Sequence, residues 1–337
     1  MTWSFQLLDN ADRPLGDLDG VNGGRSEIVA LSALGGSASM SIDRRRDIDW
    51  MKDRVQARWT GPTGSWAVGT YLFTSPQEQH TEFGVTHEVG LLTKVSILSE
   101  DSVDDRYTLP EGTPIIPAVL TLIRSTGETR IAVTDSPATL TSALTWPAGT
   151  TKLSIINDLL QAAGYWSLWC DGSGQFRVEP YVAPRDRSPA YVFEHGEASV
   201  HFPNWSREQD MTSVPNKITL QTQGSDTEPV LIGVAKNENP DSPFSFQARG
   251  RWITPQTETV EASSQAVIDS LATRRLADAM SPVSRLSVTH AMLELHPNEL
   301  VEFIPEDGKR RLASIQRMSM DYTFDTDIAA EWREVVL

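Results

Sequence analysis

The stretch TKLSIINDLLQAAGYWSLWCDGSGQFRVEPY, residues 151–181, decides how this 337-residue chain is interpreted. Thr151-Lys152-Leu153-Ser154 opens a helical pattern, and Gly164 ends it, as a left-handed cap commonly does. The apolar positions of that pattern are Leu153, Ile156, Leu159 and Leu160. The apolar runs 166–170 and 175–182 then flank Asp171-Gly172-Ser173-Gly174. Because aspartate–glycine between two apolar runs is a strong hairpin signal, the stretch predicts a helix followed by a β-hairpin.

The residues before this stretch alternate between short β-type runs and glycine-rich turns. Runs rich in aromatic and β-branched residues cover 3–8, 27–31, 38–42, 54–60, 66–75 and 89–98. Such regular spacing of short strands is typical of a β-barrel or sandwich. The segment 107–125 differs, because its apolar residues Ile115, Ile116, Val119, Leu120 and Ile123 recur at helical spacing. A turn followed by a short helix is expected there, with Pro117 in the first turn.

The last third of the chain returns to strands. Strand-like runs cover 216–223, 229–235, 252–260, 285–293, 300–303, 311–322 and 328–336. One helix interrupts them, capped by Ser263 or Ser264, with an apolar stripe from Val267 to Met280 and an end before Pro282. The segment 236–250 reads as a long loop. The sequence therefore predicts a β-rich α+β fold with domains at 1–128, 129–210 and 211–337, the middle one being a small inserted α+β domain.

Composition narrows the function classes. The net charge is −16, which argues against gripping DNA or anionic lipid, since phosphate contacts need a basic face. A negative channel wall would instead repel the phosphates and keep DNA moving. The single cysteine, Cys170, excludes an internal disulfide framework and a multi-cysteine zinc site. Residues 1–9 do not form a signal peptide, and no run has the apolar length of a membrane helix.

Catalytic motifs do not emerge from the sequence. His80 and His87 flank Phe83-Gly84, and His195 and His201 flank Gly196, but neither pair has a third metal ligand at a standard spacing. Residues 171–175 resemble the start of a calcium loop, yet the twelfth position is Val182 rather than glutamate. Neither a phosphate-binding glycine loop nor a serine elbow occurs. We therefore predict no catalytic, cofactor-binding or metal-binding residue, no cofactor and no enzyme activity.

The charged clusters and the tryptophans are explained by solvation and packing, without a binding or catalytic role. Asp43, Asp47 and Asp49 surround Arg44-Arg45-Arg46, which is interpreted as a solvated, charge-balanced loop. The acidic turn at 101–105 is interpreted in the same way. Ten tryptophans are present, and most are assigned to cores and interfaces.

Several stretches resemble, in order, the tail-hub family of long-tailed bacteriophages. They are Leu34-Gly35-Gly36-Ser37-Ala38, Ile48-Asp49-Trp50, the strand 54–59, the strand 69–74 and the turn 107–113. The middle unit adds the helix from Ile155, then Ala163-Gly164-Tyr165, the hairpin 171–181, Pro184, Arg187 and Val214-Pro215-Asn216-Lys217-Ile218. The resemblance spans nearly the whole chain.

The resemblance implies a structural virion protein. It implies two barrel-like tube domains per chain, at 1–128 and 211–337, so that a homotrimer forms a pseudo-sixfold ring adapting a sixfold tube to a threefold tip. The implied partners are further copies of the chain, the tail tube or distal tail protein ring, the tape measure protein, tip or fibre proteins, and DNA that passes without specific binding. The implied location is the virion tail tip, after assembly in the host cytoplasm.

Two other function classes stay open at this point. One is a cell-wall hydrolase at the tail tip, which would need a pair of carboxylates across a cleft. The other is a carbohydrate-binding tail component, which would need an exposed tryptophan, with Trp205 and Trp252 as candidates.

Overall fold

The computed structural model describes residues 1–30, 32–43, 48–62, 64–82, 84–183, 186–209, 212–222, 230–260, 264–280 and 284–335. Contacts divide the chain into two compact units. The larger unit comprises Met1–Trp205 and Ser287–Leu337, and the smaller one comprises Ser206–Leu286. The smaller unit is therefore inserted in the sequence of the larger one.

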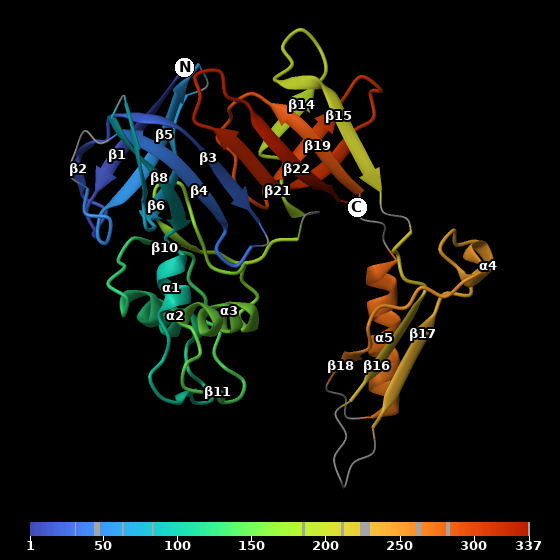
Figure 1. Ribbon diagram of the computed structural model, residues 1–337. Coiled ribbons are helices and arrows are strands. Elements are labelled where there is room, and N and C mark those ends of the chain that lie inside the picture. Colours follow the sequence, from blue (N-terminus) through green and yellow to red (C-terminus); the bar gives the residue numbers. More distant parts are fainter. Residues whose placement is uncertain are drawn as a thin grey trace. The chain divides into compact units, whose positions relative to one another are not determined.

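The larger unit is built on one long β-sheet (Figure 1). Its strands are β1 (Thr2–Leu8), β2 (Pro14–Asp17), β3 (Val21–Val29), β4 (Gly36–Asp43), β5 (Arg54–Gly61), β6 (Gly64–Phe73), β7 (Gln77–Thr81), β8 (Gly84–Thr93), β14 (Tyr191–Glu194), β15 (His201–Gln209), β19 (Ser284–His290), β20 (Leu300–Ile304), β21 (Arg311–Asp321) and β22 (Ile328–Glu334). They follow the order β15-β19-β22-β21-β3-β4-β8-β6-β5-β1-β2, with β20 beside β21, β14 beside β20 and β7 beside β8. Antiparallel ladders dominate, and β14 pairs with β20 in parallel.

Strand β21 joins the N-terminal and C-terminal parts of this sheet. Its first residues, 311–314, pair with β20, whereas its last residues, 317–321, pair with β3. On its other side it pairs with β22, and the register shifts between Ile315 and Arg317. A bulge of this kind bends a strand and increases its twist. One strand can therefore serve two differently oriented halves of the sheet.

The N-terminal half curls around its own apolar core. The core residues come from β1, β4, β5, β6 and β8: Phe5, Leu7, Met40, Ile42, Val55, Ala57, Tyr71, Phe73, Val89 and Leu91. Ser26 of β3 lies 3.0 Å from the Tyr71 hydroxyl of β6 and 2.5 Å from the Tyr322 hydroxyl, although β4 and β8 separate β3 from β6 in the sheet. The ring of Tyr322 also lies 4.9 Å from that of Trp3. Curvature has brought distant strands face to face.

This half remains an open sheet in the part of the chain that the structure describes. No ladder joins β3 to β1 or β2 there, so the predicted pair of barrel-like domains is not confirmed. Instead, the ring of Tyr322, whose backbone amide donates a hydrogen bond to Gly24 of β3, contacts the rings of Trp3 and Phe5 in β1. Burial raises the pKa of Tyr71 to about 12, so its hydroxyl stays neutral within the Ser26–Tyr322 hydrogen-bond chain.

The C-terminal half has an aromatic core. The rings of Phe193 and Trp332 lie 4.8 Å apart, and those of Phe303 and Trp332 lie 5.7 Å apart. His290 lies 4.9 Å from Phe193 and is fully buried. Aromatic pairs at such distances add to the stability that burial provides. The two halves of the sheet therefore have separate cores.

A helical layer lies against the N-terminal half (Figure 1). It contains α1 (Ser96–Glu100), α2 (Ile115–Arg124), α3 (Lys152–Ala162), a sheet of β10 (Ile131–Val133), β13 (Phe176–Val178) and β12 (Trp169–Cys170), and the pair β9 (Tyr107–Leu109) with β11 (Leu144–Trp146). The predicted helices at 115–124 and 152–162 and the hairpin around 171–174 are confirmed. Thr151 caps α3 by accepting a hydrogen bond from the Ser154 amide, and Gly164 has a left-handed φ of 73°.

The predicted strand run 89–98 is divided between a strand and a helix. The run 89–98 ends as a strand at Thr93, and α1 follows, because Val95 and Leu98 bury their side chains in the helical core. That core already begins at Val95 and continues to Val178. The contacts also set residues 206–286 apart as a unit. The domain bounds 1–128, 129–210 and 211–337 stay a prediction.

The smaller unit is one helix packed on a small sheet. It contains β16 (Lys217–Gln221), β17 (Ile232–Lys236), β18 (Glu258–Thr259), α4 (Phe246–Arg249) and α5 (Gln265–Ala279). Its core is formed by Ile218, Leu220, Ala235, Ile268, Ala272 and Leu276. The predicted helix is confirmed, whereas the loop 236–250 contains α4 and the strand 252–260 is reduced to β18. Pro282 lies outside the described residues.

Acid should destabilise the C-terminal half through His290. Burial lowers the pKa of this histidine from 6.5 to about 4, and its Nε2 finds no partner among the described residues. Between these values the unfolded chain binds more protons than the folded one, so the free energy of unfolding falls as pH decreases from 6.5 to about 4. The expected loss is roughly 3 kcal/mol. Urea unfolding at several pH values should show a weaker pH dependence for His290→Phe than for the exposed control His80→Gln. Equal dependence in the two variants would contradict the assignment.

Candidate functional site

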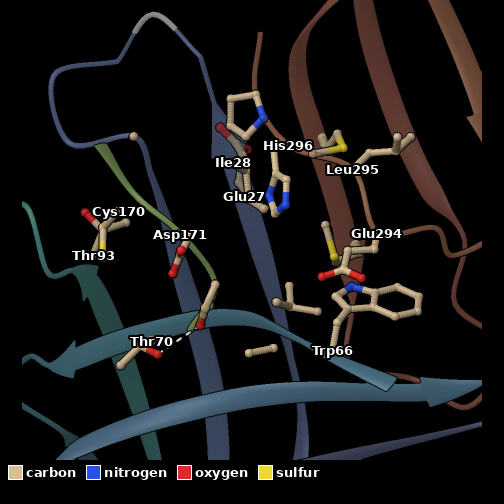
Figure 2. A pocket seen from close by; sticks show the side chains of 18 of the residues that line it. Glu27, Ile28, Trp66, Thr70, Thr93, Cys170, Asp171, Glu294, Leu295 and His296 are labelled. Atoms are coloured by element: carbon tan, nitrogen blue, oxygen red, sulfur yellow. Dashed lines mark hydrogen bonds between the residues drawn. The ribbon is translucent and has the colours of Figure 1, made fainter. Parts of the chain in front are cut away.

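A small cavity lies where the hairpin β12–β13 meets the large sheet (Figure 2). Trp66 and Thr70 reach it from β6, Cys170 and Asp171 from the hairpin, and Glu294 and His296 from the segment after β19. Its volume is about 60 Å³. Pockets that hold substrates are usually about 300–1,000 Å³, so this cavity is suited to a few water molecules at a seam between elements.

The tip of the hairpin is seated directly on β6. Thr70 donates a hydrogen bond from its hydroxyl to the carbonyl oxygen of Gly172, at 2.9 Å (Figure 2). A Cβ atom at Gly172 would lie 2.0 Å from the carbonyl oxygen of Ala67, closer than real side chains approach backbone. The sequence predicted Gly172 as a turn residue. The structure gives it a second role, because only glycine allows this close contact between the helical layer and the sheet.

Beside the hairpin lies a buried network of four charges. The Nζ atom of Lys94 is 2.5 Å from Asp12 Oδ2 and 2.7 Å from Glu128 Oε2. The Arg54 guanidinium is 2.7 Å from Asp12 Oδ1 and 2.6 Å from Glu128 Oε1. Lys94 has no exposed surface, and the other three side chains are at most 7% exposed. Two buried cations and two buried carboxylates thus pair with one another, and the partly exposed Arg130 lies 4.0 Å from Asp12 Oδ2 at the rim of the network.

This network joins parts of the chain that are distant in sequence. Asp12 follows β1, Arg54 begins β5, Lys94 follows β8, and Glu128 follows α2. Lys94 also donates a hydrogen bond to the carbonyl oxygen of Gly174 at the hairpin tip, at 2.9 Å. Buried charges are costly unless each one is paired, so the network is stable only when sheet and helical layer are both in place.

The sequence carried little sign of these residues. Lys94 stands inside the apolar run 89–98, and a lysine in such a run was the one available signal. The other three charges look like ordinary surface residues in sequence. Spacing could not reveal them because their partners lie 34 to 82 positions away.

A second cavity, of about 450 Å³, lies between residues 166–179 and 187–190 on one side and residues 296–300 on the other. It is lined by aromatic and charged side chains, including Trp166, Trp169, Arg177 and Arg187. Its volume falls within the usual range for ligand sites. Sequence reasoning did not single it out, since the two segments meet only in the folded chain.

The histidine pairs considered from the sequence are not brought together as metal ligands. His80 Nε2 lies 3.3 Å from Glu78 Oε1, whereas His87 is buried against the Trp50 ring. His195 lies 3.6 Å from Glu306, and His201 packs on Phe303. Over the residues that the structure describes, no group of three or more histidine, cysteine, aspartate or glutamate side chains could hold a metal ion.

The other residues weighed from the sequence have local roles. Asp171 accepts hydrogen bonds from the backbone amides of Ser173 and Gln175, which is the pattern of a turn rather than a calcium loop. Burial raises the pKa of Cys170 to about 12, so its thiol stays protonated and unreactive at neutral pH. Asp43 accepts a hydrogen bond from Asn22. Residues 44–47 lie outside the described residues.

The two tryptophans considered for sugar binding are engaged within the protein. Trp205 donates a hydrogen bond to Glu306 at 3.1 Å, and its ring lies 5.2 Å from the Phe303 ring. Trp252 stacks on Phe246 at 4.7 Å, and the Lys236 ammonium lies 5.6 Å from its ring centroid.

Comparison with known proteins places the fold. No known family profile matches the sequence, and no curated protein matches it either. The tail protein from Neisseria meningitidis MC58 is 14% identical with a TM-score of 0.68, over 99% of this chain and 97% of that one. The 43 kDa tail protein of prophage MuSo2 from Shewanella oneidensis is 12% identical with a TM-score of 0.66, over 98% of each chain.

A third solved structure extends the comparison to secretion machines. An E. coli component of the type VI secretion system, described as similar to the T4 bacteriophage tail proteins gp27 and gp5, is 9% identical with a TM-score of 0.54. The match covers 94% of this chain and 74% of that one. Identities this low establish fold alone. The chain has the fold of phage tail proteins, and the resemblance expected from its sequence is confirmed at that level.

None of the helices in the described ranges combines the length and the apolar character needed to cross a membrane.

Removing one charge from the buried network should be costly. Lys94→Met leaves Asp12 and Glu128 with Arg54 as their remaining buried cation, and we expect a loss of about 3–5 kcal/mol in the free energy of unfolding. The matched control is Lys152→Met, because Lys152 pairs with the partly exposed Asp101, where the loss should stay below about 1 kcal/mol. The double variant Lys94→Met/Asp12→Asn should be less destabilised than Lys94→Met alone, since charge balance returns. Urea unfolding measures all three, and equal losses for Lys94→Met and Lys152→Met would refute the role of the network.

Adding a methyl group at the hairpin tip should weaken its docking on β6. Gly172→Ala forces a clash with the Ala67 carbonyl, and we expect a loss of roughly 1–3 kcal/mol in the free energy of unfolding. The control is Gly23→Ala, because a Cβ atom there meets nothing within 4 Å. Thermal unfolding followed by circular dichroism compares the two. If Gly172→Ala and Gly23→Ala have the same melting temperature, the close contact at Gly172 is not required for stability.

Proposed function

We propose that this protein is a structural virion protein that forms a homotrimeric hub ring at the distal end of a phage tail tube. The observation that carries the proposal is the fold shared with phage tail proteins over 97–99% of both chains. A match over the full length concerns the whole architecture, including both halves of the sheet and the helical layer. The proposal is the one expected from the order of motifs in the sequence.

Three copies would supply six sheet halves. Each chain contributes two halves with separate cores, joined through β21. Each half would then act as a barrel-like tube domain, with the α+β part outside the ring. A ring of three chains could in this way meet a sixfold tube on one side and a threefold tip on the other.

The edges of the large sheet support assembly with further copies. β2 and β15 end the strand order, and most side chains of both strands are exposed. Strands at the end of a sheet tend to pair with another chain, and ring closure would cover both of them. The exposed edges would thus become contacts between neighbouring subunits.

The net charge suits a passage for DNA that is not held. With 45 acidic and 29 basic residues the chain would repel phosphates rather than bind them. The proposed partners are the tail tube or distal tail protein ring, the tape measure protein and tip or fibre proteins. The proposed location is the virion tail tip after assembly in the host cytoplasm, and the proposed role is non-enzymatic.

Native mass spectrometry tests the ring directly. We expect a species with three times the 37.2 kDa mass of one chain, and end-on electron microscopy of that species should show a central opening. The same preparation should fail to retard double-stranded DNA on a native gel at physiological salt. A chain that stays monomeric at all concentrations, both alone and with its tube protein, would refute the proposal. A trimer that packs without an opening would also refute it.

A further inference from the structure

The 450 Å³ cavity contains Arg187, an arginine without an ion-pair partner among the described residues. Arg187 donates a hydrogen bond from NH1 to the carbonyl oxygen of Asn298, and its Cζ lies 5.3 Å from the ring centroid of Trp166. Its Nε–H is buried and has no acceptor in the described part of the chain. No carboxylate of the described residues lies within ion-pair distance of it. Burial without such a partner lowers the pKa of Arg187 below its ordinary value.

The neighbouring Arg177, unlike Arg187, is paired with carboxylates. Its Nε donates to Glu179 Oε1 at 2.8 Å, and its NH1 lies 3.7 Å from Asp171 Oδ2. The carboxylate of Glu299, also in the cavity wall, accepts a hydrogen bond from the His296 amide at 2.8 Å. Arg177 is therefore paired within the cavity wall, whereas Arg187 has no carboxylate partner among the described residues and is the cation that an incoming anion would meet.

The two indoles of the cavity are held in place by other side chains. Trp166 contacts Arg187, and its ring also meets the Tyr181 ring edge-on at a centroid distance of 4.5 Å. Trp169 has the Arg177 guanidinium 5.9 Å from its ring and the His296 ring at 5.9 Å. A sugar ring would need an open aromatic face on which to stack. These contacts favour an ionic contact with a protein side chain over sugar stacking.

We infer that this cavity is a docking site for an acidic peptide segment of a partner protein, with a carboxylate of that segment paired to the Arg187 guanidinium. Arginine presents a planar fork that matches a carboxylate, and tryptophan and arginine are enriched where proteins bind tightly. The rigid Trp166 and Trp169 walls would exclude water around the pair. The inference goes beyond the proposed hub role and holds whether or not the chain forms a ring.

The test follows the indole N–H signals of the ¹⁵N-labelled full chain by NMR. The probes are N-acetyl-Glu-Gly-amide and its uncharged counterpart N-acetyl-Gln-Gly-amide, with glucuronate as an acidic sugar. Trp166→Phe and Trp169→Phe assign the two relevant signals. We expect the glutamate peptide to shift both signals saturably and to bind at least tenfold more tightly than the glutamine peptide and glucuronate.

Variants separate the role of Arg187 from general stability. Arg187→Gln should weaken binding of the glutamate peptide at least tenfold, and Arg187→Lys should lie between it and the unmodified chain, because it keeps the charge but loses the fork. The control Arg124→Gln, on the exposed end of α2, should bind like the unmodified chain. Equal binding of the glutamate and glutamine peptides, unchanged binding by Arg187→Gln, binding of glucuronate alone, or no shift with any probe would each overturn the inference.

Discussion

The structure depends on the pairing of Lys94 with Asp12 and Glu128 in the buried interface between the sheet and the helical layer. An ammonium group with no exposed surface is stable only where carboxylates and carbonyl oxygens replace its hydration. Here one carboxylate comes from the sheet side and the other from the end of α2, and the Gly174 carbonyl adds a contact from the hairpin. Neither layer can leave without exposing a charge that the other layer neutralises. The network therefore fixes the position of the helical layer on the sheet.

The close contact of the hairpin tip with β6 constrains the same interface sterically. Gly172 lets the tip touch the backbone of β6, and Thr70 completes the contact with a hydrogen bond. The cavity that remains beside the contact is about 60 Å³. So little free volume means that the hairpin and the sheet are closely packed. Closely packed protein interiors transmit strain. The helical layer and the N-terminal half of the sheet are thus expected to behave as one body.

Strand β21 joins the two halves of the sheet, as the charge network joins the sheet and the helical layer. Its two ends pair with β20 and β3, so the two separate cores share a strand. The Ser26, Tyr71 and Tyr322 hydroxyls then link strands that are not neighbours in the ladder. This arrangement gives one chain two curved halves, and it is the feature on which a pseudo-sixfold trimer would rest. Here side-chain hydroxyls of interior strands meet across the curved sheet, whereas a barrel would be closed by a continuous backbone ladder.

The sequence by itself determined the local elements. Helical spacing placed α2, α3 and α5, the Asp-Gly signal placed the β12–β13 hairpin, and the order of motifs indicated the tail-protein fold. These signals are short-range, so they are contained in neighbouring residues. The tertiary structure alone decided that Val95 and Leu98 belong to a helical core, and that Lys94 is a buried charge. It also decided that Arg187 lies in a cavity, and that the sheet stays open over the described residues. The physical reason is that burial, charge compensation and strand closure each depend on groups far apart in the chain, and local spacing carries no information about their distance in space.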